Sequence, residues 1–140
     1  MDGPPVIRQC SIRRYRCTSC GATVTVAPRE TLTHRLFSAP AIALALALFG
    51  LAGQSLPEVR RRVSPWATVG ATAASTWVTV PRWTRAIREG RLFETVRHAP
   101  EGWAPRQVAA RAATTLAAHA PLAPGPPGLI AAAFDGALAL

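Results

Sequence analysis

Two cysteines separated by two residues form the pattern in this sequence that is best suited to bind a metal ion. Cys17 and Cys20 enclose a Thr-Ser dipeptide, and Gly21 follows directly. Zn²⁺ in proteins takes four thiolate or imidazole ligands at the corners of a tetrahedron, and a Cys-x2-Cys pair supplies one edge of it. The glycine permits the left-handed turn that such a knuckle needs. The pattern therefore predicts half of a zinc site.

The sequence has no second Cys-x2-Cys pair that could supply the other two zinc ligands. Cys10 is the candidate third ligand and His34 the candidate fourth, although Cys10 falls on a predicted strand and His34 on a polar connector. Two interpretations stay open: a zinc site with Cys17, Cys20 and Cys10 among its ligands, or a knuckle that carries no metal and is held by local packing. A redox pair is disfavoured because no βαβ unit surrounds it.

Positive charge is the second feature that could support binding. The 140 residues include 16 basic and 7 acidic side chains, for a net charge of +9, and every basic residue is arginine. The excess lies within residues 1–100, whereas residues 101–140 are neutral. The flat fork of donors on arginine suits phosphate groups and guanine edges. A compact region of this charge attracts polyanions, either nucleic acid or an anionic membrane.

Two predicted helices carry much of this charge. The first begins with a capping box, Ser55 to Glu58, and ends before Pro65. The second is capped by Thr79 and ends at Gly90. In the second helix, the 3.6-residue period puts Val80, Trp83 and Ile87 on one face and arginines on the opposite face. The arginines of the two helices are Arg60, Arg61, Arg62, Arg82, Arg85 and Arg88.

This order of helices is typical of a helix-turn-helix unit, in which the second helix enters the major groove and the first crosses the backbone. Arg60, Arg61 and Arg62 would contact phosphates, and Arg82, Arg85 and Arg88 would face the groove. The alternative to DNA binding is that the arginines form a solvated face on helices with a purely structural role. DNA binding is favoured, because the arginines are separated from a core face that contains tryptophan. Residues 64–78 exceed a tight turn, which predicts an extra short helix or a degenerate motif.

The remaining pattern indicates a mostly α-helical fold with a small N-terminal β-hairpin. Residues 6–28 form the zinc-ribbon-like hairpin, with strands at 11–16 and 23–26. Residues 38–97 form a helical, helix-turn-helix-like domain around an apolar central helix that Ser38 caps. Residues 98–140 form an Ala/Pro-rich tail with short helices. The expected architecture is thus a knuckle followed by a helical bundle.

The order of these parts resembles the N-terminal region of bacterial insertion-sequence transposases and of uncharacterised zinc-ribbon and helix-turn-helix proteins related to them. It covers residues 8–97 and rests on three segments: Ile12-Arg-Arg-Tyr-Arg-Cys-x2-Cys-Gly21, Arg35-Leu-Phe-Ser38 before an apolar helix, and Val80-Pro-Arg-Trp-x3-Ile87. The resemblance implies that Cys17 and Cys20 correspond to the second zinc pair, and the basic helices to the surface that binds the element ends.

The chain departs from that family in two respects. The first cysteine pair, expected upstream of Ile12, is absent, which suggests a truncated N-terminus or a decayed copy. A transposase catalytic domain, in which three carboxylates converge on divalent metal, is also absent. The resemblance therefore implies a protein that binds DNA without cutting it.

These observations predict a small cytoplasmic DNA-binding protein that is not an enzyme, with zinc as its candidate cofactor and a homo-oligomer left open. The alternative is a membrane-surface or partner-binding adaptor that uses the apolar segment 39–53 and the cysteine knuckle. That segment is shorter than the roughly 20 residues of a bilayer span, and its immediate flanks carry few basic residues. A membrane role is therefore disfavoured.

Overall fold

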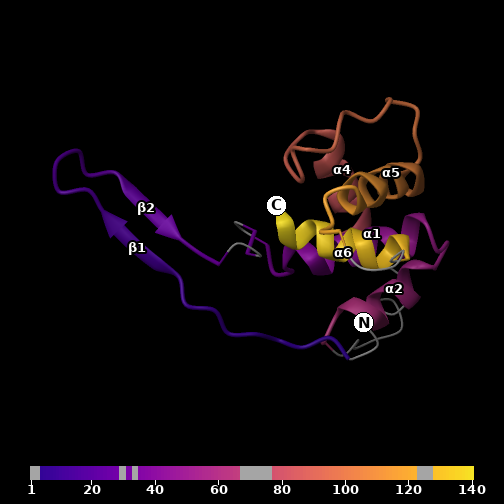
Figure 1. The fold of residues 1–140 in the computed structure, drawn as a ribbon, viewed down its shortest axis with the longest axis horizontal. Coiled ribbons are helices and arrows are strands. Elements are labelled where there is room, and N and C mark those ends of the chain that lie inside the picture. Colours follow the sequence, from indigo (N-terminus) through magenta and orange to yellow (C-terminus); the bar gives the residue numbers. More distant parts are fainter. Residues whose placement is uncertain (1–3, 29–30, 33–34, 67–76, 123–127) are drawn as a thin grey trace.

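The structure, a computed structural model, describes residues 4–28, 31–32, 35–66, 77–122 and 128–140. A two-stranded hairpin projects from a helical body, as Figure 1 shows. The predicted mostly helical fold with a small N-terminal hairpin is confirmed. The strands are β1 (Arg13–Arg16) and β2 (Thr23–Val26), and the described helices are α1 (Ala39–Gly50), α2 (Leu56–Val63), α4 (Thr79–Arg88), α5 (Pro105–Ala117) and α6 (Leu129–Ala139).

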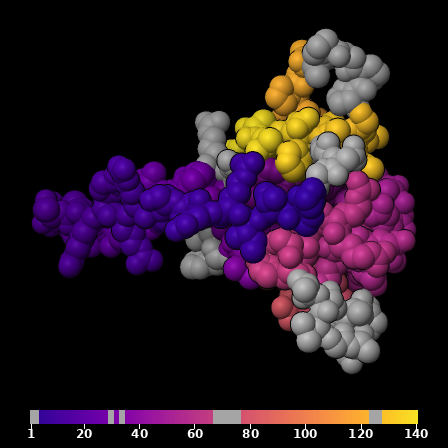
Figure 2. Space-filling model, turned by 90° about the horizontal axis from the view of Figure 1, so that it is seen from below, coloured from indigo at the N-terminus to yellow at the C-terminus, as the bar shows by residue number. Residues whose placement is uncertain are grey.

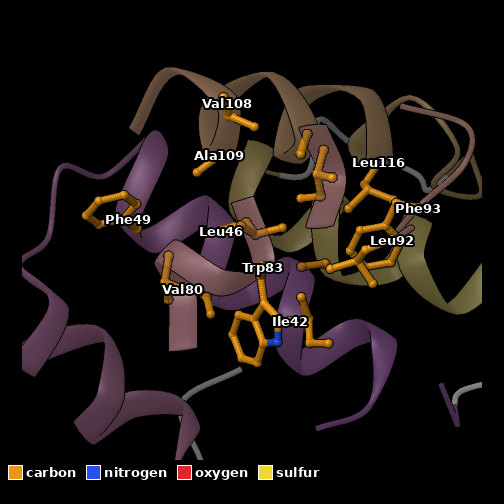
Figure 3. Close-up of a cluster of buried hydrophobic side chains, with 14 of the residues drawn as sticks. Ile42, Leu46, Phe49, Val80, Trp83, Leu92, Phe93, Val108, Ala109 and Leu116 are labelled. Carbon is orange, nitrogen blue, oxygen red and sulfur yellow. The ribbon is translucent and has the colours of Figure 1, made fainter. Parts of the chain in front are cut away.

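Helix α1 is the buried centre of the body, as its Ala/Leu composition predicts. The Ser38 hydroxyl caps it by accepting a hydrogen bond from the backbone N–H of Ala41 at 3.4 Å. Ile42 and Leu46 are completely buried. Figure 3 shows these two side chains among others from α4, α5 and the segment after α4. A helix that is apolar nearly all round requires cover on several sides, and the surrounding helices provide it.

Helices α5 and α6 pack against α1 and against each other, and glycines permit close approach between α1 and α5 and between α5 and α6. A Cβ atom added at Gly50, the last residue of α1, would lie 2.3 Å from the backbone nitrogen of Ala110 in α5. One added at Gly136 in α6 would lie 1.8 Å from the carbonyl oxygen of Leu116. Residues 98–140 were predicted to form a tail, and they contribute two helices to the core that surrounds α1. Residues 123–127, between these two helices, lie outside the described residues.

Helix α2 has the predicted bounds and the predicted capping box. The backbone N–H and the hydroxyl of Ser55 both donate to the Glu58 carboxylate, at 2.7 and 2.6 Å. The hydroxyl hydrogen bond and then the backbone one lower the pKa of Glu58. Val59 and Val63 are buried, and both point into the core that includes α1. The sequence pattern therefore identified both the start and the inner face of this helix.

Helix α4 begins one residue earlier than predicted. Val78 occupies the N-cap position and makes no side-chain cap, so the prediction that Thr79 is the cap is wrong. The physical reason is the backbone of Val78, which is already helical and makes Thr79 the first residue inside the helix. At the other end, Gly90 has a φ of 67°, which agrees with the predicted glycine stop. The extra helix expected within residues 64–78 lies mostly outside the described residues.

An aromatic cluster ties the connector after the hairpin to α4. Phe37 makes edge-to-face contacts with Trp66, Trp77 and Trp83, with ring centroids 5.2 to 6.1 Å apart. Trp77 and Trp83 also contact each other edge-on, at 5.7 Å. Such pairs add to the free energy of burial. Three of the four tryptophans therefore serve packing, and this cluster anchors the point from which the hairpin leaves the body.

The hairpin itself is a regular antiparallel pair. Arg14 pairs with Thr25, and Arg16 pairs with Thr23. At the connecting turn, the N–H of Cys17 donates to the carbonyl of Ala22 at 2.8 Å, and Gly21 has a φ of 72°. The left-handed glycine of the knuckle is therefore confirmed. Every residue from 6 to 28 is exposed, so this arm has no hydrophobic core of its own.

Candidate nucleic-acid interface

The arginines of α2 lie at its C-terminal end. Arg61 and Arg62 are exposed, whereas Arg60 is half-buried. Val59 and Val63 are buried and hold the inner side of the helix against the core. Positive charge in a last helical turn also compensates the free carbonyl groups there. Arg61 and Arg62 are thus available to solvent, in a position that stabilises the helix as well.

Helix α4 separates its apolar and basic faces as predicted, with one exception. Arg82 and Arg85 are exposed, while Val80, Trp83 and Ile87 are buried. Figure 3 shows Val80 and Trp83 in the core. The exception is Arg88, which was predicted to face DNA.

Arg88 is half-buried, and its guanidinium donates a hydrogen bond to the carbonyl of Trp103. The chain after α4 folds back so that Trp103 meets the last turn of the helix. This contact satisfies a carbonyl within the body and takes Arg88 out of the outward-facing set. Arg88 is therefore less available to a ligand than Arg82 and Arg85, and its contact with DNA stays a prediction.

The two basic helices are joined through the core. Helix α2 packs on α1, and α4 packs on α5 and α1. Over the described ranges, α2 and α4 share no extensive interface. A direct helix pair of the helix-turn-helix type thus stays a prediction.

A groove of about 1250 Å³ brings Arg61 and Arg62 together with two arginines that the sequence pattern did not single out, Arg8 and Arg35. One wall is the N-terminal segment, which Figure 2 shows lying across the helical body. Trp66, 45% exposed, also lines it. Among its described lining residues there is no Asp or Glu. Arg8 and Arg35 lie outside any periodic helix, so only the folded chain reveals where they gather.

Few acidic side chains compete for these arginines. Within the described ranges, the one ion pair joins Arg91 to Glu89, away from α2. Arg61 lies near enough to Glu58 to contribute slightly to lowering the pKa of that carboxyl. The exposed arginines of α2 and α4 therefore keep most of their positive potential for a ligand.

The cysteine knuckle is exposed at the far end of the arm. Cys10, Cys17 and Cys20 are all free thiols. The backbone N–H groups of Cys20 and Ser19, and then the Cys20 side chain, donate to Cys17 and lower the pKa of its thiol. Hydrogen bonds of this kind stabilise a thiolate, the form that binds metal.

The structure does not gather the predicted zinc ligands into one cluster. No group of three His, Cys, Asp or Glu side chains is close enough to hold a metal ion in the part of the chain that the structure describes, so Cys10 does not join the pair. His34 lies outside the described residues. Cys17 and Cys20 fit one edge of a zinc tetrahedron, and the described residues supply no more than that edge.

Comparisons with protein-family models, curated proteins and solved structures gave no match. Among the described helices, none has the length and apolar character needed to cross a membrane.

Proposed function

We propose that this protein binds duplex DNA through the exposed arginines of α2 and α4. The observation that carries the proposal is the division of α4: Arg82 and Arg85 face solvent directly opposite the buried Trp83 and Ile87. The core fixes the helix in place, and the two arginines extend from its outer face into solvent. Arginine in such a fixed position can contact phosphates or the edge of guanine.

Arg61 and Arg62 have a supporting role in this proposal. They lie at the edge of a groove that Arg8 and Arg35 also line, and contacts from such a cluster would go to phosphates. Phosphate contacts position a protein on DNA without selecting a sequence. Base selection, where there is any, then falls to Arg82 and Arg85 on α4, with α2 crossing the backbone as in a helix-turn-helix protein.

Zinc is part of the same proposal. Cys17 and Cys20 would supply two of the four tetrahedral zinc ligands, and the remaining ligands would come from outside the described residues. A bound zinc ion would stabilise the knuckle, because thiolate ligation links metal binding to folding. The protein would then act as a non-catalytic DNA-binding protein of the cytoplasm, in line with its resemblance to the N-terminal region of transposases.

The membrane-surface alternative loses the surface on which it depends. It requires the apolar face of segment 39–53, but Ile42, Leu46 and Leu48 are buried beneath neighbouring helices. Insertion into lipid would require the body to open, which disfavours this function.

Binding of a fluorescent duplex, followed by anisotropy at several salt concentrations, tests the proposal. The variant Arg82→Glu/Arg85→Glu should abolish binding, because it reverses charge on the face assigned to DNA. The matched control Arg91→Glu/Arg97→Glu makes the same net charge change at exposed positions after α4. The control should bind more tightly than the α4 variant. Equal binding by the parent and the α4 variant would refute the assignment.

A further inference from the structure

The projecting hairpin is strongly basic, and the arginines on its strands have no part in the function proposed for the helices. Residues 4–28 contain Arg8, Arg13, Arg14 and Arg16 and not one Asp or Glu. Each of these side chains is exposed. Figures 1 and 2 show the arm extending well beyond the helical body. Like charges on a small arm repel one another, so an arrangement of this kind favours a polyanionic partner.

The two faces of the hairpin differ in chemistry. Side chains alternate between faces along a strand, and paired residues share a face. Arg14 with Thr25 and Arg16 with Thr23 therefore form one face, made only of hydrogen-bonding side chains. The opposite face holds Arg13, Tyr15, Val24 and Val26. The face with Arg14 and Arg16 is the one suited to phosphates and base edges.

We infer that this hairpin is a second grip on DNA, which inserts its Arg14/Arg16 face into a groove beyond the stretch of duplex contacted by the helical body. The major groove admits a two-stranded β-ribbon. Strands lie about 4.8 Å apart, and the groove is about 12 Å wide, so the ribbon fits with its side chains. One guanidinium nitrogen of Arg16 lies 3.9 Å from the point where a Cβ added to Gly21 would be, which places Arg16 at the knuckle end of the ribbon.

The placement of the arm supports a continuous contact. The N-terminal segment that forms a wall of the groove beside Arg61 and Arg62 leads directly into β1. Arg8 lies on this segment, between the two sets of arginines. A DNA backbone that contacts α2 could therefore follow the segment outward to the ribbon. The inference rests on the proposed function, because it extends the same DNA partner to a second surface.

The variant Arg14→Thr/Arg16→Thr tests the inference without weakening the strands. Threonine favours strands, and each new threonine would face an existing threonine across the pair. The matched control Arg91→Thr/Arg97→Thr removes the same charge after α4. Binding is measured by anisotropy on duplexes of about one and about three helical turns (~10 and ~30 bp), and hydroxyl-radical footprinting gives the length protected.

We expect the arm variant to bind the long duplex about tenfold to a hundredfold more weakly at 0.1 M salt, with a log–log salt slope reduced by about 1.8. Its footprint should be shorter than that of the parent, and its affinity for the short duplex unchanged. The control should keep the full footprint. Arg14→Lys/Arg16→Lys should restore most of the salt slope, because it restores the charge.

The outcomes separate this inference from the proposed function. If the arm variant keeps the footprint and salt slope of the parent while Arg82→Glu/Arg85→Glu loses binding, the arm inference is wrong and the proposed function stands. If the arm variant loses binding and the α4 variant does not, the arm is the principal site and the assignment to α4 is wrong. If the parent protein binds no duplex, both are wrong.

Discussion

The helical body and the hairpin arm are stabilised in opposite ways. The body surrounds α1 with α2, α4, α5 and α6, so that side chains such as Leu46 and Leu116 are fully buried. The arm buries no side chain from residue 6 to residue 28 and is held by backbone pairing between β1 and β2. A lone two-stranded hairpin is marginally stable in water. This contrast implies that the arm is far less stable than the body.

The largest change in stability should come from a cavity in the core of the helical body. Leu46→Ala removes a side chain at the centre of α1 and leaves a cavity, which should lower the free energy of unfolding by about 3 kcal/mol. Thermal unfolding followed by circular dichroism measures this. Val24→Ala is the counterpart in the arm, where the side chain is 58% exposed, and should change the stability by less than about 0.5 kcal/mol. Comparable losses in the two variants would contradict the contrast.

A smaller loss should follow from an added methyl group between helices. Gly136→Ala would place a Cβ 1.8 Å from the carbonyl oxygen of Leu116, a backbone atom that cannot turn away as the end of a side chain can. Overpacking costs about 1 to 3 kcal/mol, and so close an overlap with backbone should lie near the upper end, above the gain of about 1 kcal/mol in helix propensity. Gly128→Ala is the control, because no atom lies within 4 Å of its added Cβ. Denaturant titration should rank Gly136→Ala as the less stable of the two.

Local signals in the sequence predicted the elements well, and long-range packing explains what they missed. Ser55 and Glu58 defined the start of α2, and Gly21 defined the turn of the hairpin, because each acts through its near neighbours. The hydrogen bond from Arg88 was not foreseen, because its partner, Trp103, lies 15 residues further on. No helical period links Arg8 and Arg35 to α2, so the groove they share could not be foreseen.

The capping box of α2 should make part of the stability of the body depend on pH. Ser55 lowers the pKa of Glu58 in the folded protein. A lowered folded pKa stabilises the protein above the unfolded pKa, and this contribution disappears as the pH falls through the folded value. Glu58→Gln should therefore lower the melting temperature at neutral pH and have little effect in acid. A difference that stays constant with pH would show that the charge of Glu58 has no part in it.

The subtlest effect concerns the arm and leaves the stability of the body unchanged. Backbone N–H groups lower the pKa of Cys17, so its thiolate should form at a lower pH than that of an ordinary cysteine. We expect iodoacetamide to modify Cys17 before Cys10, which is also an exposed free thiol, when peptides are mapped by mass spectrometry at increasing pH.

Ser19→Pro provides the control for this measurement, because proline has no N–H and so removes one of the donors to the Cys17 thiol. The pH at which Cys17 reacts should then rise toward that of an ordinary thiol. Added Zn²⁺ should slow the modification of Cys17 and Cys20 together, because a thiolate bound to metal is a poorer nucleophile than a free one. If Cys17 and Cys10 react in parallel in both proteins, the turn does not activate the knuckle, and it is then no better prepared for metal than any exposed thiol.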